Sequence, residues 1–465
     1  MVLAQTTDSI QRAHDALAAS LGAQRVSISS GDREQHARDQ STLPARMPDL
    51  VIWPETTEHV SVVLKYANDH NIPVVAWGAG TSLEGNPIPI RGGILLDFQK
   101  MNKVVAVHAQ DFQVTVQPGV LYKDLNRDLG KQGLFFAPDP GANASLGGMI
   151  ANNAAGIRTV KYGATRDNVL ALEVVLADGT IVHTGSRSVK QSAGYDLTHL
   201  IIGSEGTLAI VTEATLKLVP IPEHFSAVVA AFPSVEHAVE TVYAVMASGL
   251  EPGAMELVDT SGILMMNKDE GMHFPELPHI FMEFSGSDAS GVKSRTEAAE
   301  ACCHDNQCVQ LAAGLDRESR QKLWDARHHF YEILIRNHPG QGRYVADVAV
   351  PISHLPELIR RSRVILDEVG IEGQIIGHAG DGNLHVTLFY PMEDAAAAAR
   401  AKETNTRLVQ AALDLDGTCT GEHGVGIGKL HAMPHEHGPA GLALMKAIKQ
   451  TMDPKGILNP GKVLP

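Results

Sequence analysis

The sequence has few of the features that mark secreted, membrane-spanning or nucleic-acid-binding proteins. Only four of its 465 residues are cysteine, with no C-x-x-C pair and no zinc-finger spacing. No apolar run approaches the ~20 residues needed to cross a bilayer. The N-terminus lacks the basic start and apolar core of a secretory signal. Lys plus Arg total 38 against 53 Asp plus Glu, a formal charge of -15, which argues against duplex nucleic acid or an anionic membrane as the main partner.

The remaining composition is that of an ordinary globular protein, with 44% apolar and 20% charged residues. The sparse, unpaired cysteines fit a reducing compartment, so we expect a cytoplasmic location, with peripheral docking at the inner membrane left open. The chain is longer than one hydrophobic core supports and predicts two or three domains.

A change of pattern divides the chain near the two prolines of VPIPEH, residues 219–224. Before it, short β-rich runs alternate with glycine-rich loops. After it, strands and helices follow one another in an order that predicts an antiparallel sheet with helices on one face. We therefore predict an α+β fold with domains at 1–222 and 223–422. The segment from about 423 to 465 is expected to pack back against the first domain.

Two histidines bracket the glycine-rich run GHAGDGNLH, residues 377–385. Asp381-Gly382 is a strong two-residue hairpin signal. Such a turn puts His378 directly opposite His385 on one face, with Cβ atoms roughly 4.5 to 5.5 Å apart. A divalent metal can use this pair. Because the chain has 22 histidines, a chance or merely hydrogen-bonded pair is the alternative, and two ligands alone do not make a site.

Three segments are dense in glycine and small hydroxyl residues: 78–86, 139–156 and 202–216. The first follows a predicted strand, but Pro87 and Pro89 exclude the helix start of a dinucleotide fingerprint, and no Walker lysine is present. Its backbone N–H groups and hydroxyls can still cradle a pyrophosphate. Glycines that serve only tight turns are the alternative for any one loop. Three such loops together favour a long, phosphate-bearing ligand lying against the backbone.

These motifs resemble a flavoprotein family. The first loop, ASLGGMIANNAAG (144–156), SAGYDLTHLIIGSEGTLAIVTEATLKL (192–218) and the closing NPGK (459–462) resemble the FAD-binding domain of the vanillyl-alcohol-oxidase (PCMH-type) flavoproteins. KLWDARHHF (322–330), VADVAVPISHLPELI (345–359), GHAGDGNLH and GTCTGEHGVGIGK (417–429) resemble its cytochrome-type D-lactate dehydrogenase branch, which acts on D-2-hydroxy acids. The likeness covers roughly residues 45 to 465. It implies a PCMH-type domain followed by an α+β substrate, or cap, domain.

The resemblance implies a binding set for FAD. The pyrophosphate would be bound by Gly78, Ala79, Gly80, Thr81 and Ser82. The flavin and ribityl region would be lined by Gly141, Ser145, Gly148, Asn152 and Gly156. Glu205, Gly206 and Ile210 would hold the adenosine side, and Asn459 would approach the ring. Some relatives tether the flavin through a histidine in the first loop. Since this loop has none, we expect the FAD to be noncovalent.

The segment GEHG, residues 421–424, supplies a third metal ligand by the same resemblance. Its flanking glycines let Glu422 and His423 point in different directions. Similar enzymes use this glutamate with the two hairpin histidines as metal ligands, and the adjacent histidine as catalytic base. Two histidines and a glutamate with open positions are typical of a catalytic metal site. Zinc suits these ligands best, while manganese and iron stay open.

Substrate binding is assigned to Arg327 and Asn383. Trp324 and Arg327 stand three residues apart on a predicted helix, and the W-x-x-R resemblance makes this arginine the anchor for a carboxylate. An ordinary surface arginine is the alternative. Relatives acting on D-2-hydroxyglutarate carry a lysine where this chain has Val345. A short monocarboxylate such as D-lactate is therefore favoured.

The expected function is metal-assisted oxidation of a D-2-hydroxy acid, D-lactate first, to the 2-oxo acid, with hydride transfer to flavin N5. Glycolate and D-2-hydroxyglutarate are alternatives within the family. Two other classes stay open: a metal-dependent hydrolase, and a noncatalytic flavoprotein subunit that relays electrons. The sequence leaves the electron acceptor open among quinone, cytochrome c, an electron-transfer flavoprotein and oxygen. A homodimer is also left open.

Overall fold

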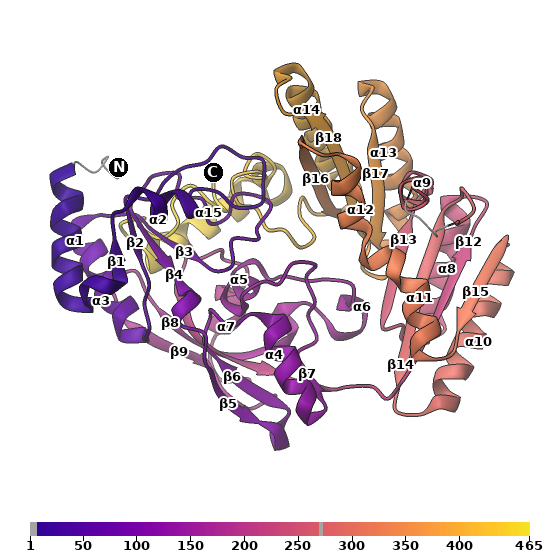
Figure 1. Ribbon diagram of the computed structural model, residues 1–465, viewed down its shortest axis with the longest axis horizontal. Coiled ribbons are helices and arrows are strands. Elements are labelled where there is room, and N and C mark those ends of the chain that lie inside the picture. Colours follow the sequence, from indigo (N-terminus) through magenta and orange to yellow (C-terminus); the bar gives the residue numbers. More distant parts are fainter. Residues whose placement is uncertain (1–6, 269–272) are drawn as a thin grey trace. The chain divides into compact units, whose positions relative to one another are not determined.

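The computed structural model describes residues 7–268 and 273–465 (Figure 1). The chain forms two compact units. Unit 1 comprises Met1–Ala155, Gly163–Ile221 and Glu422–Pro465, and unit 2 comprises Gly156–Tyr162 and Pro222–Gly421. The chain thus leaves unit 1 twice, once for the short segment that contains α6 (Thr159–Tyr162) and once for the body of unit 2. No pattern in the sequence indicates the first of these two crossings into unit 2.

Unit 1 contains a four-stranded sheet in the order β1-β2-β4-β3. Its strands are β1 (Val26–Ser27), β2 (Leu50–Ile52), β3 (Val74–Trp77) and β4 (Ile94–Asp97). Both β2 and β3 pair with β4 in parallel, and β1 is antiparallel to β2. Helices α1 (Thr7–Leu21) and α3 (Thr57–His70) share its core, to which they contribute Leu17 and Leu64. Leu458, near the end of the chain, bridges to Val74 and joins the same core.

A five-stranded antiparallel sheet, ordered β5-β6-β10-β8-β9, forms the rest of unit 1 together with a two-stranded ribbon. The strands are β5 (Val104–His108), β6 (Gln113–Val116), β8 (Val169–Val175), β9 (Ile181–Gly185) and β10 (Ile210–Lys217), with β7 (Leu134–Phe135) and β11 (Val219–Pro220) in the ribbon. The helices are α2 (Ser30–Gln35), α4 (Tyr122–Leu129), α5 (Leu146–Asn152), α7 (Leu197–Ile201) and α15 (Met433–Met452). Apolar residues of α4, α5 and α7 and those of the larger sheet form a second core.

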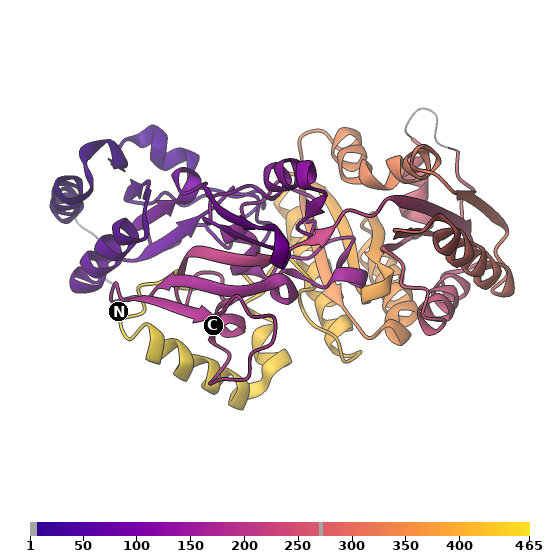
Figure 2. The same cartoon turned by 90° about the horizontal axis from the view of Figure 1, so that it is seen from below.

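Unit 2 is built on one seven-stranded antiparallel sheet, ordered β15-β12-β14-β13-β17-β18-β16. Figure 2 shows the helices and strands of this unit in pink to orange. The strands are β12 (His224–Ala231), β13 (Ala254–Val258), β14 (His279–Gly286), β15 (Gln310–Gly314), β16 (Gln341–Ala349), β17 (Gly373–His378) and β18 (Asn383–Pro391). With this antiparallel sheet and its helices, the predicted α+β class is confirmed.

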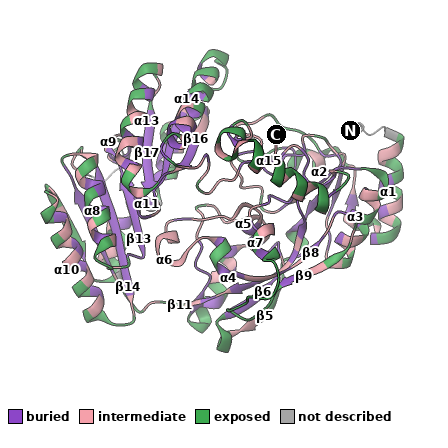
Figure 3. Cartoon of the chain, turned by 180° about the vertical axis from the view of Figure 1, so that it is seen from behind, coloured by how far each residue is buried: buried purple, intermediate pink, exposed green. Residues whose placement is uncertain are grey.

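Helices cover both faces of this sheet, so the prediction of helices on one face is wrong. The helices are α8 (Val235–Ala247), α9 (Thr260–Met266), α10 (Ala289–Asp305), α11 (Arg317–His328), α12 (Phe330–Asn337), α13 (Leu355–Val369) and α14 (Ala395–Leu413). Ser226 of β12 hydrogen-bonds Thr296 of α10, whereas its neighbour Ala227 packs in one cluster with Trp324 of α11. Adjacent strand residues point to opposite faces, so α10 and α11 lie on opposite sides. The central strands are accordingly buried throughout (Figure 3).

The sequence pattern predicts one helix across 316–337, but the structure has two, because the helix breaks at His329 between α11 and α12. Among the described residues, no helix is both long enough and apolar enough to span a bilayer.

Candidate active site

The two hairpin histidines lie on adjacent strands, but they are not opposite each other. His378, the last residue of β17, pairs with Asn383, and His385 pairs with Ile376. The turn runs over four residues and ends at Gly382, which has a φ of 69°. A Cβ at Gly382 would overlap the carbonyl oxygen of Val350, so only glycine permits this close approach. The predicted two-residue turn is therefore wrong.

The prediction that His378 and His385 lie on one face of the strand pair is correct despite the different register. His378 and His385 are now diagonal neighbours across the strand pair, and the diagonal also keeps two side chains on one face. Their ring centroids are 5.1 Å apart and the rings meet edge to face. Both residues are more than nine-tenths buried. Two imidazoles are thus held next to each other out of solvent.

Glu422 completes a set of three possible metal ligands. It follows directly after Gly421, the last residue of unit 2. One ligand atom from each of His378, His385 and Glu422 lies within 4.8 Å of the others. Zinc ligands sit about 2.0 to 2.2 Å from the ion, so two ligands of one ion are separated by up to about 4 Å. The donor types fit a single divalent cation, and the ligand atoms would have to draw together by up to about 1 Å to hold it.

Two buried carboxylates that sequence reasoning missed lie beside the histidines. Oε1 of Glu256 is 2.6 Å from Nδ1 of His378, and Oδ1 of Asp347 is 3.7 Å from Nδ1 of His385. Burial raises the pKa of Glu256, but the neighbouring charges of Arg327 and His378 outweigh it and leave the pKa below its usual value. A signal was present: both acids stand inside otherwise apolar strands, AMELV and YVADVA. Fully buried acids are rare unless they are paired.

Arg327 is a buried residue, so the alternative of an ordinary surface arginine does not hold. It donates from Nε, at 2.9 Å, and from Nη2 to Oε2 of Glu256. Trp324, one turn earlier on α11, is fully buried in the core. Asn383 donates to Oδ1 of Asp347 at 2.8 Å, so part of its amide is used within unit 2. The roles of Arg327 and Asn383 in substrate binding stay predictions.

The first two glycine-rich loops touch each other. A Cβ at Gly78 would overlap Oγ of Ser145. This hydroxyl caps α5 by accepting a hydrogen bond from the backbone N–H of Gly148. Ala79, Gly80, Thr81 and Ser82 continue the loop after β3, Gly141 precedes α5, and Asn152 is the last residue of α5. These predicted FAD-binding residues therefore belong to one region of unit 1, whereas Gly156 lies in unit 2.

Glu205 joins distant segments of unit 1. Its buried carboxylate accepts hydrogen bonds from Nδ2 of Asn86 at 2.7 Å and from the backbone N–H groups of Val425 and Gly426 at 2.6 and 3.0 Å. Nδ2 of Asn459 donates to the backbone carbonyls of Asn86 and Glu205, at 3.0 and 2.7 Å. Burial raises the pKa of Glu205. The predicted residues Glu205 and Asn459 thus hold the first loop, the third loop and the chain end together.

Three features of unit 1 fit a ligand that lies on the backbone. Oδ1 of Asn86 is buried and has no hydrogen-bond partner among the described residues. A Cβ at Gly141 would meet no described atom within 4 Å, and one at Gly206 would meet none closer than 3.9 Å. Buried polar atoms normally have partners, and bare backbone allows close approach. Ile210, by contrast, has its side chain in the apolar core, so this side chain is used in packing.

His423 follows Glu422 and belongs to unit 1. Its backbone carbonyl accepts hydrogen bonds from the side-chain amides of Asn86 and Asn152, each at 3.4 Å. Its Nε2 is 3.9 Å from Oε1 of Glu422, and the side chain keeps 13% of its exposure. The backbone of this histidine is therefore fixed by both predicted FAD loops.

Lys462, in the closing NPGK, should make stability depend on pH. Burial lowers its pKa to about 8, although the charges of Glu205 and Asp39 raise it. An unfolded lysine has a pKa of about 10.4, so the folded chain binds fewer protons between about pH 8 and 10.4, and stability rises with pH in this window. Replacing Lys462→Met should remove roughly 3 kcal/mol of that rise. Urea unfolding of both proteins at several pH values measures this rise in stability. If stability rose equally with pH in both proteins, the prediction would be wrong.

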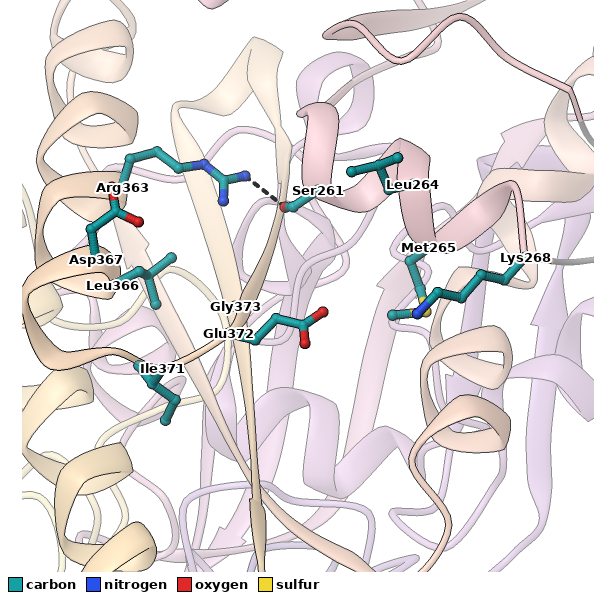
Figure 4. A pocket seen from close by; sticks show the side chains of 10 residues that line it. All are labelled: Ser261, Leu264, Met265, Lys268, Arg363, Leu366, Asp367, Ile371, Glu372 and Gly373. Atoms are coloured by element: carbon teal, nitrogen blue, oxygen red, sulfur yellow. Dashed lines mark hydrogen bonds between the residues drawn. The ribbon is translucent and has the colours of Figure 1, made fainter.

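A separate cavity of about 290 Å³ lies on unit 2 (Figure 4). It is lined by Ser261, Leu264, Met265, Lys268, Arg363, Leu366, Asp367, Ile371, Glu372 and Gly373. Arg363 donates to Ser261 at 2.6 Å and is also paired with Asp259. The lining contains both acids and bases and none of the predicted site residues.

Comparison with known families gives the class of the protein. Residues 48–185 match the FAD binding domain, and residues 221–463 match the C-terminal domain of FAD linked oxidases. The second match covers more than half of the chain, which therefore belongs to the FAD-linked oxidases. The resemblance seen in the sequence motifs is confirmed, and the protein is a flavin-dependent oxidoreductase.

Individual relatives refine this placement. The chain is 41% identical to a "Probable D-lactate dehydrogenase, mitochondrial" of Danio rerio, over 98% of this chain and 93% of that one. It is 40% identical to "D-lactate dehydrogenase [cytochrome], mitochondrial" of Arabidopsis thaliana, over 93% and 77%. It is 35% identical to "Glycolate oxidase subunit GlcD" of Bacillus subtilis, over 95% and 94%. These relatives extend along nearly the whole chain.

Solved structures show the same fold at lower identity. A 4-ethylphenol oxidase from Gulosibacter chungangensis matches with a TM-score of 0.79 at 18% identity, over 99% of this chain and 98% of that one. A p-cresol methylhydroxylase matches with a TM-score of 0.76 at 18% identity, over 98% and 97%. The predicted PCMH-type fold is thereby confirmed.

Proposed function

We propose that this protein oxidises a D-2-hydroxy acid, D-lactate first, to the corresponding 2-oxo acid. The observation that carries the proposal is the cluster of His378, His385 and Glu422 in a chain whose relatives include D-lactate dehydrogenases. A hydroxy acid offers a hydroxyl oxygen that a cation can bind and a carboxylate that an arginine can hold.

Each residue has a separate task in this proposal. Arg327 holds the substrate carboxylate, using N–H groups beyond the two that pair with Glu256. His423 accepts the proton of the C2 hydroxyl on a ring nitrogen. Bound FAD would take up the hydride from C2, and a cation held by His378, His385 and Glu422 would make the hydroxyl more acidic. Zinc is the first expectation for that cation.

Anaerobic mixing of the purified protein with a panel of D- and L-2-hydroxy acids tests the proposal. D-lactate should bleach the flavin absorbance completely, and L-lactate should leave it unchanged. A protein that stays yellow with every D-2-hydroxy acid would contradict the proposal.

His423→Ala should slow flavin reduction by D-lactate by about 10² to 10⁴-fold, the usual contribution of a positioned base. Stopped-flow absorbance at saturating substrate measures this rate. His183→Ala is the control, since His183 is an exposed histidine of the same unit. If His423→Ala bleached as fast as the parent, His423 would not be the base.

Glycolate is the second candidate because the Bacillus subtilis relative is a glycolate oxidase subunit. A dicarboxylate is less well supported. Val345 pairs with Thr387, and Asp347, two residues further along β16, pairs with His385. These residues share one face of the sheet. An isopropyl group therefore stands two residues from the Asp347–His385 pair, and it offers neither charge nor hydrogen bond to a second carboxylate.

A further inference from the structure

The carboxylate of Glu256 has a different partner on each oxygen. Oε1 is 2.6 Å from Nδ1 of His378. Oε2 accepts from Nε of Arg327 at 2.9 Å and also from its Nη2. The side chain is fully buried, and all three residues belong to unit 2. One acid thus touches both a candidate metal ligand and the candidate substrate anchor.

The arrangement follows from the sheet register and one helix. Glu256 lies directly opposite His378 in the pairing of β13 with β17, and Arg327 comes from α11 on the same face. The other four residues of β13 are apolar and buried. Burying an ion pair contributes little net stability compared with apolar residues of similar size. Stability alone therefore does not account for an acid at this place.

A second, partly buried pair on the same helix provides a comparison. Arg320, two turns before Arg327 on α11, donates from Nε at 2.7 Å, and also from Nη2, to Oε2 of Glu283. Glu283 is a buried residue of β14, the strand next to β13. The chemistry matches that of Glu256 and Arg327 closely. The difference is that Glu256 also contacts a histidine of the candidate metal site.

We propose that Glu256 is a positioning residue that orients His378 for a divalent cation and Arg327 for the substrate carboxylate. This inference rests on the proposed function. A carboxylate on Nδ1 of His378 fixes the orientation of the ring, and Nε2 would then serve as the ligand atom toward the cation. With Nε and Nη2 of Arg327 on the other oxygen, the plane of the guanidinium is fixed as well. Binding of the cation and binding of the substrate therefore both depend on Glu256.

Glu256→Gln tests this inference because an amide has only one acceptor oxygen. The NH₂ group of the glutamine must then face either the N–H of His378 or the N–H groups of Arg327. In either case two donors oppose each other and a hydrogen bond is lost. We expect the affinity for Zn²⁺, measured on the flavin-loaded protein by competition with a chromophoric chelator, to fall by about 10 to 100-fold. At saturating Zn²⁺, KM for D-lactate should rise by about tenfold, with kcat changing by less than about threefold.

Glu283→Gln is the matched control. It breaks a partly buried Glu–Arg pair and should lower thermal stability, yet leave Zn²⁺ affinity and KM within about twofold of the parent. If Glu256→Gln kept parental Zn²⁺ affinity and KM, or if Glu283→Gln lost them equally, Glu256 would have no positioning role. A parent protein that binds no Zn²⁺ would also overturn the inference.

Glu256→Asp is the second variant, to be used if the glutamine variant does not fold. It keeps the charge and both acceptors but shortens the reach, so Zn²⁺ affinity should fall severalfold. Parental affinity in this variant would refute the inference. The chelator competition needs no turnover. A flavin that D-lactate fails to bleach would therefore count against the proposed function, while the Zn²⁺ measurement still decides the role of Glu256 toward His378.

Discussion

Replacing His385 with alanine should lower the rate of flavin reduction by D-lactate by about 10³-fold and reduce bound metal to a small fraction per chain. The proposed site would lose one of three protein ligands. Stabilisation by a bound Lewis acid is worth several kcal/mol, and each 1.36 kcal/mol is a factor of ten in rate. Stopped-flow absorbance gives the rate, and elemental analysis of the same sample gives the metal.

The control for this variant is His304→Ala, since His304 is an exposed histidine of α10 in the same unit. It should keep both the parental rate and the parental metal content. If the His385 variant lost its metal but kept the parental rate, flavin reduction would not require the metal. The cation would then be structural, and the metal-assisted part of the proposal would be wrong.

Replacing Gly78 with alanine should weaken FAD binding by roughly five- to tenfold, so that less FAD is retained through purification. The new Cβ would overlap Oγ of Ser145, so either the first loop or the cap of α5 must move. Loss of a serine N-cap costs about 1 kcal/mol, and each 1.4 kcal/mol of binding energy is a factor of ten in affinity. The absorbance ratio of flavin to protein after purification measures the occupancy.

Two further variants show whether the overlap with Ser145 causes the loss of FAD. Gly31→Ala is the control, because a Cβ there meets no described atom within 4 Å. The double variant Gly78→Ala with Ser145→Ala removes the overlapping hydroxyl, and the remaining Cβ is 3.3 Å away. It should recover part of the flavin. Full FAD occupancy in the single variant would show that these two loops do not form the flavin site together.

The histidine pair shows what a local sequence pattern can predict and what it cannot. Spacing and turn residues placed His378 and His385 on one face of a hairpin, and this is what the structure has. The register came out differently because Gly382 packs against the backbone of Val350. That contact joins segments that are distant in the sequence. A dipeptide signal cannot anticipate it.

The same limit applies to the partners of Arg327. Its place on a helix with Trp324 follows from local periodicity. Glu256 stands 71 residues earlier in the chain and becomes its neighbour only through the packing of α11 on the sheet. Helices on the second face were missed for a related reason: an apolar strand predicts burial, but not which element covers each side.

The placement of the chain ends has a consequence for how the protein is made. Ile457 and Leu458 are part of the core that surrounds the β1-β2-β4-β3 sheet, yet they are translated after every residue of the seven-stranded sheet. On the ribosome, the nascent FAD-binding half must therefore wait for its final core residues, while the inserted half is already fully synthesised.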